Sequence, residues 1–148
     1  MRVWVDADAC PNIIKDILCR AAERTKTEMI FVSNQPIRTL KSSFVKNLIV
    51  TAGFDVADNR IIQELEEGDL VISADIPLVD AVISKGGHAI HPRGELYTKN
   101  NIKQRLAIRN FNESVRSSGV ITGGPDKMTK KDIQLFANCL DQFLTTHR

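Results

Sequence analysis

The sequence lacks any apolar run long enough to cross a membrane. Its 148 residues are 43% hydrophobic and 26% charged, and every uninterrupted apolar stretch falls well short of the roughly 20 residues that a transmembrane helix needs. The amino terminus leads directly into the apolar residues 3–5, without the basic and apolar regions of a signal peptide. We therefore expect a cytoplasmic protein with no membrane partner.

Cysteine motifs for metal binding or redox chemistry are also absent. The three cysteines, Cys10, Cys19 and Cys139, form no CxxC pair, and His88 and His91 do not have the spacing of a zinc finger. Free cysteines of this kind are usually buried. The acids beside Cys10 would raise the pKa of its thiol rather than lower it, so we expect no reactive thiol.

No internal repeat, low-complexity tract or long linker divides the chain. A chain of this length is sufficient for one domain with a full hydrophobic core. We therefore expect one α/β domain over residues 1–148, with a helical part that begins at about residue 98.

Short apolar segments alternate with amphipathic ones. The pattern predicts strands at residues 2–6, 29–32, 48–50, 69–73 and 88–91, and helices at 11–24, 58–67, 76–85, 98–118 and 129–147. Asp58 would cap the second of these helices, and Thr129 with Asp132 would form a capping box for the last. The alternation predicts a three-layer α/β/α fold around a central, mostly parallel sheet of about five strands.

Acidic residues follow two of the predicted strands. Asp6 ends the first strand and Asp8 follows it, whereas Asp75 lies just past the fourth strand and Asp80 lies further along the next helix. In open parallel sheets, ligands bind outside the carboxyl ends of the strands. If the first and fourth strands are neighbours, these acids converge. Clustered carboxylates need a cation to remain ionised, and Mg²⁺ or Mn²⁺ prefers such oxygen ligands. A helix cap or a loop acid is the alternative for each residue alone.

The charge is unevenly distributed. Residues 1–92 contain 10 basic and 13 acidic residues, whereas residues 93–131 contain 9 basic and 3 acidic residues. A basic flank beside an acidic site suits a polyanion such as RNA. Arg38, Arg105 and Arg109 are candidates for holding phosphates bidentately; solvated surface residues are the alternative. The backbone of residues 123–125 (GGP) could also approach an anion, although a plain turn is favoured.

Several strings resemble one bacterial family. They are WVDADACP at residues 4–11, AGFDVADN at 52–59, GDLVISADIPL at 68–78, RNF at 109–111 and GGP at 123–125, the last followed by Asp132 and Phe136. This set resembles the YaiI/YqxD family of uncharacterised bacterial proteins over nearly the whole chain. That family resembles in turn the PIN-like nucleases, in which an Asp ends the first strand and a (T/S)-x-D motif begins a helix.

The resemblance implies a PIN-like fold and a metal-dependent nuclease acting on RNA. Asp6, Asp8 and Asp75 would be catalytic metal ligands, with Asp80 as a weaker candidate. A further acid of typical PIN domains has no unique match here, because Asp58, Glu64 and Asp69 compete for it. Pro77 stands where many of these nucleases carry another acid.

Two other functions remain open. One is a non-catalytic module that binds nucleic acid or protein, for which the basic residues 93–131 are suited. The other is a haloacid-dehalogenase-like phosphatase, in which Asp6 would be the nucleophile and Asp8 the acid/base. That chemistry also needs a Lys and a hydroxyl, and Lys46 and Ser33 are the candidates.

Overall fold

The computed structural model describes residues 1–35, 43–51, 56–107 and 128–146. Within them lies a five-stranded sheet in the order β3-β2-β1-β4-β5. Its strands are β1 (Val3–Asp6), β2 (Met29–Ser33), β3 (Val45–Ile49), β4 (Leu70–Ile72) and β5 (His88–Ile90). Every neighbouring pair is parallel, which confirms the predicted α/β class with a parallel central sheet.

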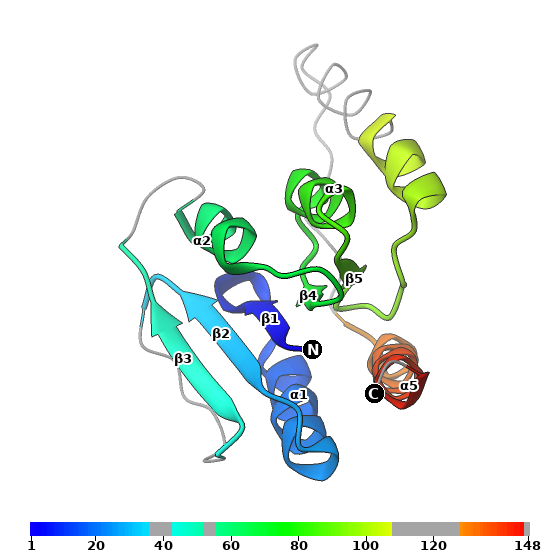
Figure 1. Cartoon of the computed structure of the whole chain (residues 1–148). Helices are drawn as coiled ribbons and strands as arrows, with labels where there is room; N and C mark the ends of the chain where they lie inside the picture. The colour runs from blue at the N-terminus through cyan, green and yellow to red at the C-terminus, as the bar shows by residue number, and fades with distance from the viewer. Residues whose placement is uncertain (36–42, 52–55, 108–127, 147–148) are drawn as a thin grey trace, which may run out of the picture.

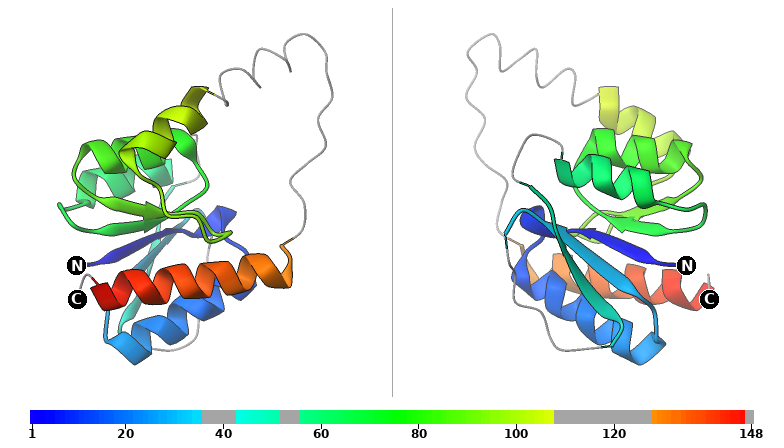
Figure 2. Two further views of the ribbon diagram at one scale, coloured as in Figure 1. Left: turned by 90° about the vertical axis from the view of Figure 1, so that its right-hand side faces the viewer. Right: turned by 60° about the vertical axis from the view of Figure 1, so that its left-hand side comes forward.

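Helices cover both faces of this sheet, giving three layers (Figure 1). The helices α1 (Asn12–Thr25) and α5 (Lys130–Thr146) lie side by side on one face. The helices α2 (Val56–Glu64) and α3 (Ile76–Ser84) cover the other face, together with a helical segment over residues 99–107. Figure 2 shows the two helical layers from the side, with the sheet between them.

The alternation of side chains along the strands fills two cores. Val3 and Val5 of β1 point to the α1 and α5 face, where they join buried residues such as Phe136. Trp4 points to the opposite face and packs with Ile61 of α2 and other buried residues. Because successive strand residues alternate between faces, a central strand covered on both sides reads as a continuous apolar run.

Among the described elements, β3 and α2 differ most from the predicted bounds. The strand predicted at residues 48–50 is β3, which begins at Val45. It is an edge strand with no fully buried residue, so its apolar signal is weak. Asp58 lies in the first turn of α2 rather than before it, so it is not the helix cap. Of the helix predicted at 98–118, residues 99–107 are helical, and residues 108–118 lie outside the described residues.

The ends of α3 and α5 are capped by side chains. The Oδ1 of Asp75 accepts a hydrogen bond from the N–H of Leu78 at 3.2 Å, and Pro77 occupies the first turn, where its missing N–H costs nothing. Thr129 and Asp132 form the predicted capping box, with hydrogen bonds of 3.0 and 3.1 Å between side chains and backbone N–H groups.

The three cysteines are free thiols, as expected. Cys10 and Cys19 are buried and Cys139 is partly buried. Burial raises the pKa of the Cys10 thiol to about 12, and the charge of Asp6 adds to this effect. Cys10 therefore remains protonated and unreactive at neutral pH. None of the helices within the described ranges has both the length and the apolar character to cross a membrane.

Candidate functional site at the carboxyl edge of the sheet

The order of the strands places a topological switch between β1 and β4. From β1 the chain adds β2 and β3 on one side, and then returns to add β4 and β5 on the other. Connections on opposite sides of the sheet leave a crevice at such a point, beyond the carboxyl ends of the strands. The residues that end β1 and follow β4 therefore face the position where parallel α/β proteins bind ligands.

A chain of hydrogen bonds joins these two strand ends. Ser73 follows β4 and donates from its hydroxyl to the Oδ2 of Asp6 at 3.2 Å. The same hydroxyl accepts a hydrogen bond from the backbone N–H of Asp75 at 3.0 Å. Ser73 is fully buried, so this pairing fixes the Asp6 carboxylate against the start of α3.

The charges of Asp75 and Asp8 both act on the Asp6 carboxyl. Burial raises the pKa of the Asp6 carboxyl, and the charges of Asp75 and Asp8 raise it further. The hydrogen bond from Ser73 opposes these effects. The structure thus brings together Asp6, Asp8 and Asp75, because β1 and β4 are neighbours.

Asn34 adds a polar group to this edge. It follows β2, and its backbone N–H donates to the Oδ2 of Asp8 at 2.7 Å. Its side-chain Oδ1 is buried, and it has no hydrogen-bond donor within the described part of the chain. A buried acceptor without a donor is unfavourable unless a cation or water satisfies it. The sequence placed Asn34 after a strand but gave no signal for this role.

The atoms at this edge that could bind a metal are oxygens, and hard cations prefer oxygen to softer ligand atoms such as sulfur. Among the described residues, no three His, Cys, Asp or Glu side chains are arranged to hold one ion. Mg²⁺ is nevertheless commonly held by one or two carboxylates, and it takes its remaining ligands from water and substrate phosphates. Asp6 together with Asp75 or Asp8 could supply the one or two carboxylates of such an open site, but not a closed cage of protein ligands.

Asp80 does not join this group. It lines a cavity of about 320 Å³ with Ser84, Lys99 and Lys103, between α3 and the 99–107 helix. The acids that act on Asp6 are Asp75 and Asp8. The spacing along the helix agrees with this, because residues five positions apart on a helix point in different directions.

The three candidates for the further acid of PIN domains lie at different ends of the fold. Asp69 is buried at the start of β4, and it accepts hydrogen bonds from the backbone of Arg2 at 3.0 Å and from the Trp4 indole at 3.1 Å. Glu64 pairs with Arg60 at the last turn of α2, beside Arg2. Both lie toward the amino edge of the sheet, opposite the site. Asp58 lies in the first turn of α2, the end nearer the carboxyl edge.

The predicted phosphate-binding arginines are only partly within the described chain. Arg105 lies on the 99–107 helix and forms a salt bridge with Glu95, which raises the pKa of the guanidinium. It is partly exposed and lies near the end of β5. Arg38 and Arg109 lie outside the described residues, as do residues 123–125.

Of the two residues that a phosphatase would need, Ser33 ends β2 at this edge, but Lys46 does not lie here. Lys46 lies near the start of β3, opposite Ile30, and pairs with Glu28 at 3.0 Å. The hydroxyl of Ser33 donates to the backbone oxygen of Gln35 at 2.6 Å. With Lys46 toward the opposite end of the sheet, the haloacid-dehalogenase arrangement loses its required Lys.

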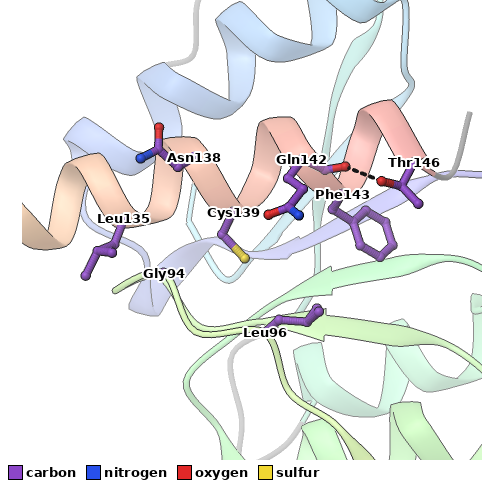
Figure 3. A pocket seen from close by; sticks show the side chains of 8 residues that line it. All are labelled: Gly94, Leu96, Leu135, Asn138, Cys139, Gln142, Phe143 and Thr146. Carbon is purple, nitrogen blue, oxygen red and sulfur yellow. Dashed lines mark hydrogen bonds between the residues drawn. The ribbon is translucent and has the colours of Figure 1, made fainter.

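A separate hollow lies on the α5 side of the molecule (Figure 3). It has a volume of about 480 Å³ and lies between α5 and the loop at residues 94–96. Leu96, Leu135 and Phe143 supply apolar walls, and Gln142 and Thr146 are joined by a hydrogen bond of 2.9 Å. None of the acids at the carboxyl edge lines it.

The fold and the residues at the carboxyl edge of the sheet define a parallel α/β protein with acidic residues at its topological switch point. The chain belongs to the family described as "Uncharacterized BCR, YaiI/YqxD family", which it matches over residues 4–146.

Similar proteins cover the full chain. A UPF0178 protein of Hahella chejuensis is 60% identical over 144 residues, which are 97% of this chain and 96% of that protein. A UPF0178 protein of Alkalilimnicola ehrlichii is 57% identical over all of both chains. The UPF0178 protein PC1_0756 of Pectobacterium carotovorum is 55% identical over 97% of this chain and 96% of its own. No solved structure matches significantly.

Proposed function

We propose that this protein is a PIN-like, Mg²⁺- or Mn²⁺-dependent nuclease that cleaves RNA. The observation that carries the proposal is the meeting of Asp6 and Asp75 through Ser73 at the switch point, with Asp8 close by. A half-buried carboxylate whose pKa is raised by two acidic neighbours is a site that a divalent cation would stabilise. Asn34 contacts Asp8, and its buried Oδ1 has no donor among the described residues, which supports the same proposal.

The chain's own residues would perform three tasks. Asp6 and Asp75 would hold the cation, and Asp8 would be kept in place by the N–H of Asn34. Ser73 would orient the Asp6 carboxylate. When bound, the cation supplies charge neutralisation for the phosphate and a water of lowered pKa for attack on phosphorus. The basic residues of the 93–131 segment favour a polyanionic substrate.

A second candidate is a nucleic-acid-binding module without catalysis. It is favoured by the finding that no three potential ligand side chains among the described residues surround one point. In this case the basic segment would bind RNA, and the affinity would fall steeply with salt.

The test uses the full chain with a fluorescent single-stranded RNA, in the presence of Mn²⁺, Mg²⁺ or EDTA. We expect metal-dependent cleavage that Asp6→Asn and Asp75→Asn reduce below detection while thermal unfolding remains cooperative. Asn also caps helices, so Asp75→Asn spares α3. Asp16→Asn, at an exposed position on α1, is the matched control.

Unchanged cleavage in both site variants would refute the nuclease assignment. Salt-dependent RNA binding without cleavage in either metal would identify the second candidate instead.

A further inference from the structure

Three neighbouring strand ends present polar side chains at one level. Val5 of β1 is opposite Ile72 of β4, and Ile72 is opposite Ile90 of β5. The residues that follow Val5, Ile72 and Ile90 in the sequence are Asp6, Ser73 and His91 respectively. The register therefore places these three residues in one row across the carboxyl edge of the sheet.

All three belong to the face covered by α2 and α3. Trp4 and Val71, two residues before Asp6 and Ser73, pack in the core on this face. Ala89, two residues before His91, packs with Val79 of α3. Side chains two positions apart on a strand share a face, so the row continues the acidic site toward β5.

The His91 ring is held in a defined orientation. Its Nδ1 accepts a hydrogen bond from the backbone N–H of Arg93 at 2.9 Å. In the neutral imidazole the proton then lies on Nε2, which makes this atom a hydrogen-bond donor. Burial lowers the pKa of His91, which keeps the ring neutral at physiological pH.

Two cationic and two anionic side chains act on His91, and one of the cations is the more exposed. Arg93 pairs with Asp132 at 2.8 Å, and both side chains are partly buried. Arg105 pairs with Glu95, but both of these side chains are more exposed. All four groups act on His91. An incoming phosphate would therefore meet the Nε2–H of His91 and an accessible guanidinium.

We propose that His91 and Arg105 bind a second phosphate of the substrate, next to the one that would be cleaved. This proposal rests on the proposed function of the Asp6 site, and it specifies the substrate as a polynucleotide strand that runs along the sheet edge from β1 to β5. Asp6 and His91 are two strand spacings apart, about 10 Å between Cα atoms, with Ser73 between them. The site thus extends beyond a single phosphodiester group.

Two substrates distinguish an effect on the proposed phosphate subsite from an effect on the cleavage site. Bis(p-nitrophenyl) phosphate offers one phosphodiester, whereas a single-stranded RNA hexamer also offers flanking phosphates. We expect His91→Phe to raise the KM for the hexamer about tenfold, the loss of one hydrogen bond to a charged group. Mn²⁺-dependent hydrolysis of the small diester should not change.

Three further variants sharpen the result. His91→Gln, which keeps an N–H donor, should restore part of the hexamer affinity. Arg105→Gln, at an exposed position, should weaken hexamer binding in the same direction and reduce its salt dependence. His88→Phe changes a histidine of the same strand that contacts Phe143 on the opposite face, and it should behave like the wild type.

An equal loss on both substrates would overturn the proposal, because His91 would then act at the reacting phosphate. Wild-type values in both His91→Phe and Arg105→Gln would also overturn it. If the wild-type protein hydrolyses neither substrate, the proposed nuclease function fails. The subsite is then decided by fluorescence anisotropy with a 2′-O-methyl hexamer. A tenfold weaker Kd in His91→Phe supports it, and an unchanged Kd refutes it.

Discussion

The Ser73 hydroxyl donates a hydrogen bond of 3.2 Å to the Oδ2 of Asp6, across 67 positions of sequence. This contact joins the end of β1 to the start of α3, because the same hydroxyl accepts from the N–H of Asp75. Asp6 is therefore held between a fixed donor and two acidic neighbours. The ionised form of Asp6 is therefore less favourable in the folded protein than in water.

The first stability prediction concerns Asp6. Its pKa in the folded protein is raised above the ordinary 3.8, so the folded state binds this proton more tightly than the unfolded state. The free energy of unfolding should then fall as pH rises through the window from 3.8 to the raised value. Asp6→Asn removes this cost. We expect a higher melting temperature than wild type at pH 7 in EDTA, and a smaller difference below pH 3.8.

Differential scanning calorimetry across this pH range checks the prediction, with Asp16→Asn as the control. A lower melting temperature for Asp6→Asn at pH 7 would contradict it. Mn²⁺ should raise the melting temperature of the wild-type protein more than that of Asp6→Asn. A cation that binds the folded state stabilises the folded state, and the variant lacks one of the proposed ligands.

Asp69 should be structural rather than catalytic. It accepts hydrogen bonds from the backbone N–H groups of Arg2 and Glu66 and from the indole N–H of Trp4. Asp69→Ala leaves these donors without a partner in a buried setting, and we expect a loss of about 3 kcal/mol in the free energy of unfolding. Urea denaturation measures it. The exposed Asp16→Ala should change stability by less than about 0.5 kcal/mol, and equal effects of the two variants would exclude this role.

Gly94 should be intolerant of a side chain. Its φ is +98°, and an added Cβ would lie 2.5 Å from the backbone carbon of Leu135 on α5. We expect Gly94→Ala to cost about 3 kcal/mol, the sum of backbone strain and overpacking. It should also loosen the loop that carries His91 and Arg93, which amide hydrogen exchange would detect as faster exchange.

Gly68 offers a matched comparison, because its φ is +89° but an added Cβ would contact nothing within 4 Å. Gly68→Ala should cost only the backbone strain, about 1 kcal/mol. Equal losses for Gly68→Ala and Gly94→Ala would show that the contact with α5 contributes nothing.

The sequence was most informative where the deciding interactions are local. Buried strands such as β1 and β2 and the helix α3 follow from apolar periodicity, and α5 follows also from its capping box of Thr129 and Asp132. It was less informative for β3, whose exposed side chains carry little apolar signal. The prediction of Asp58 as a helix cap was wrong, because α2 begins before it, at Val56.

What the sequence by itself determined is the parallel α/β class and the presence of Asp6, Asp8 and Asp75 after strand ends, because both depend on neighbours along the chain. Only the tertiary structure decided that β1 and β4 are adjacent, that Asp80 faces Lys99 and Lys103, and that His91 continues the row of Asp6 and Ser73. Strand order and register arise from packing between distant segments, so no local pattern specifies them.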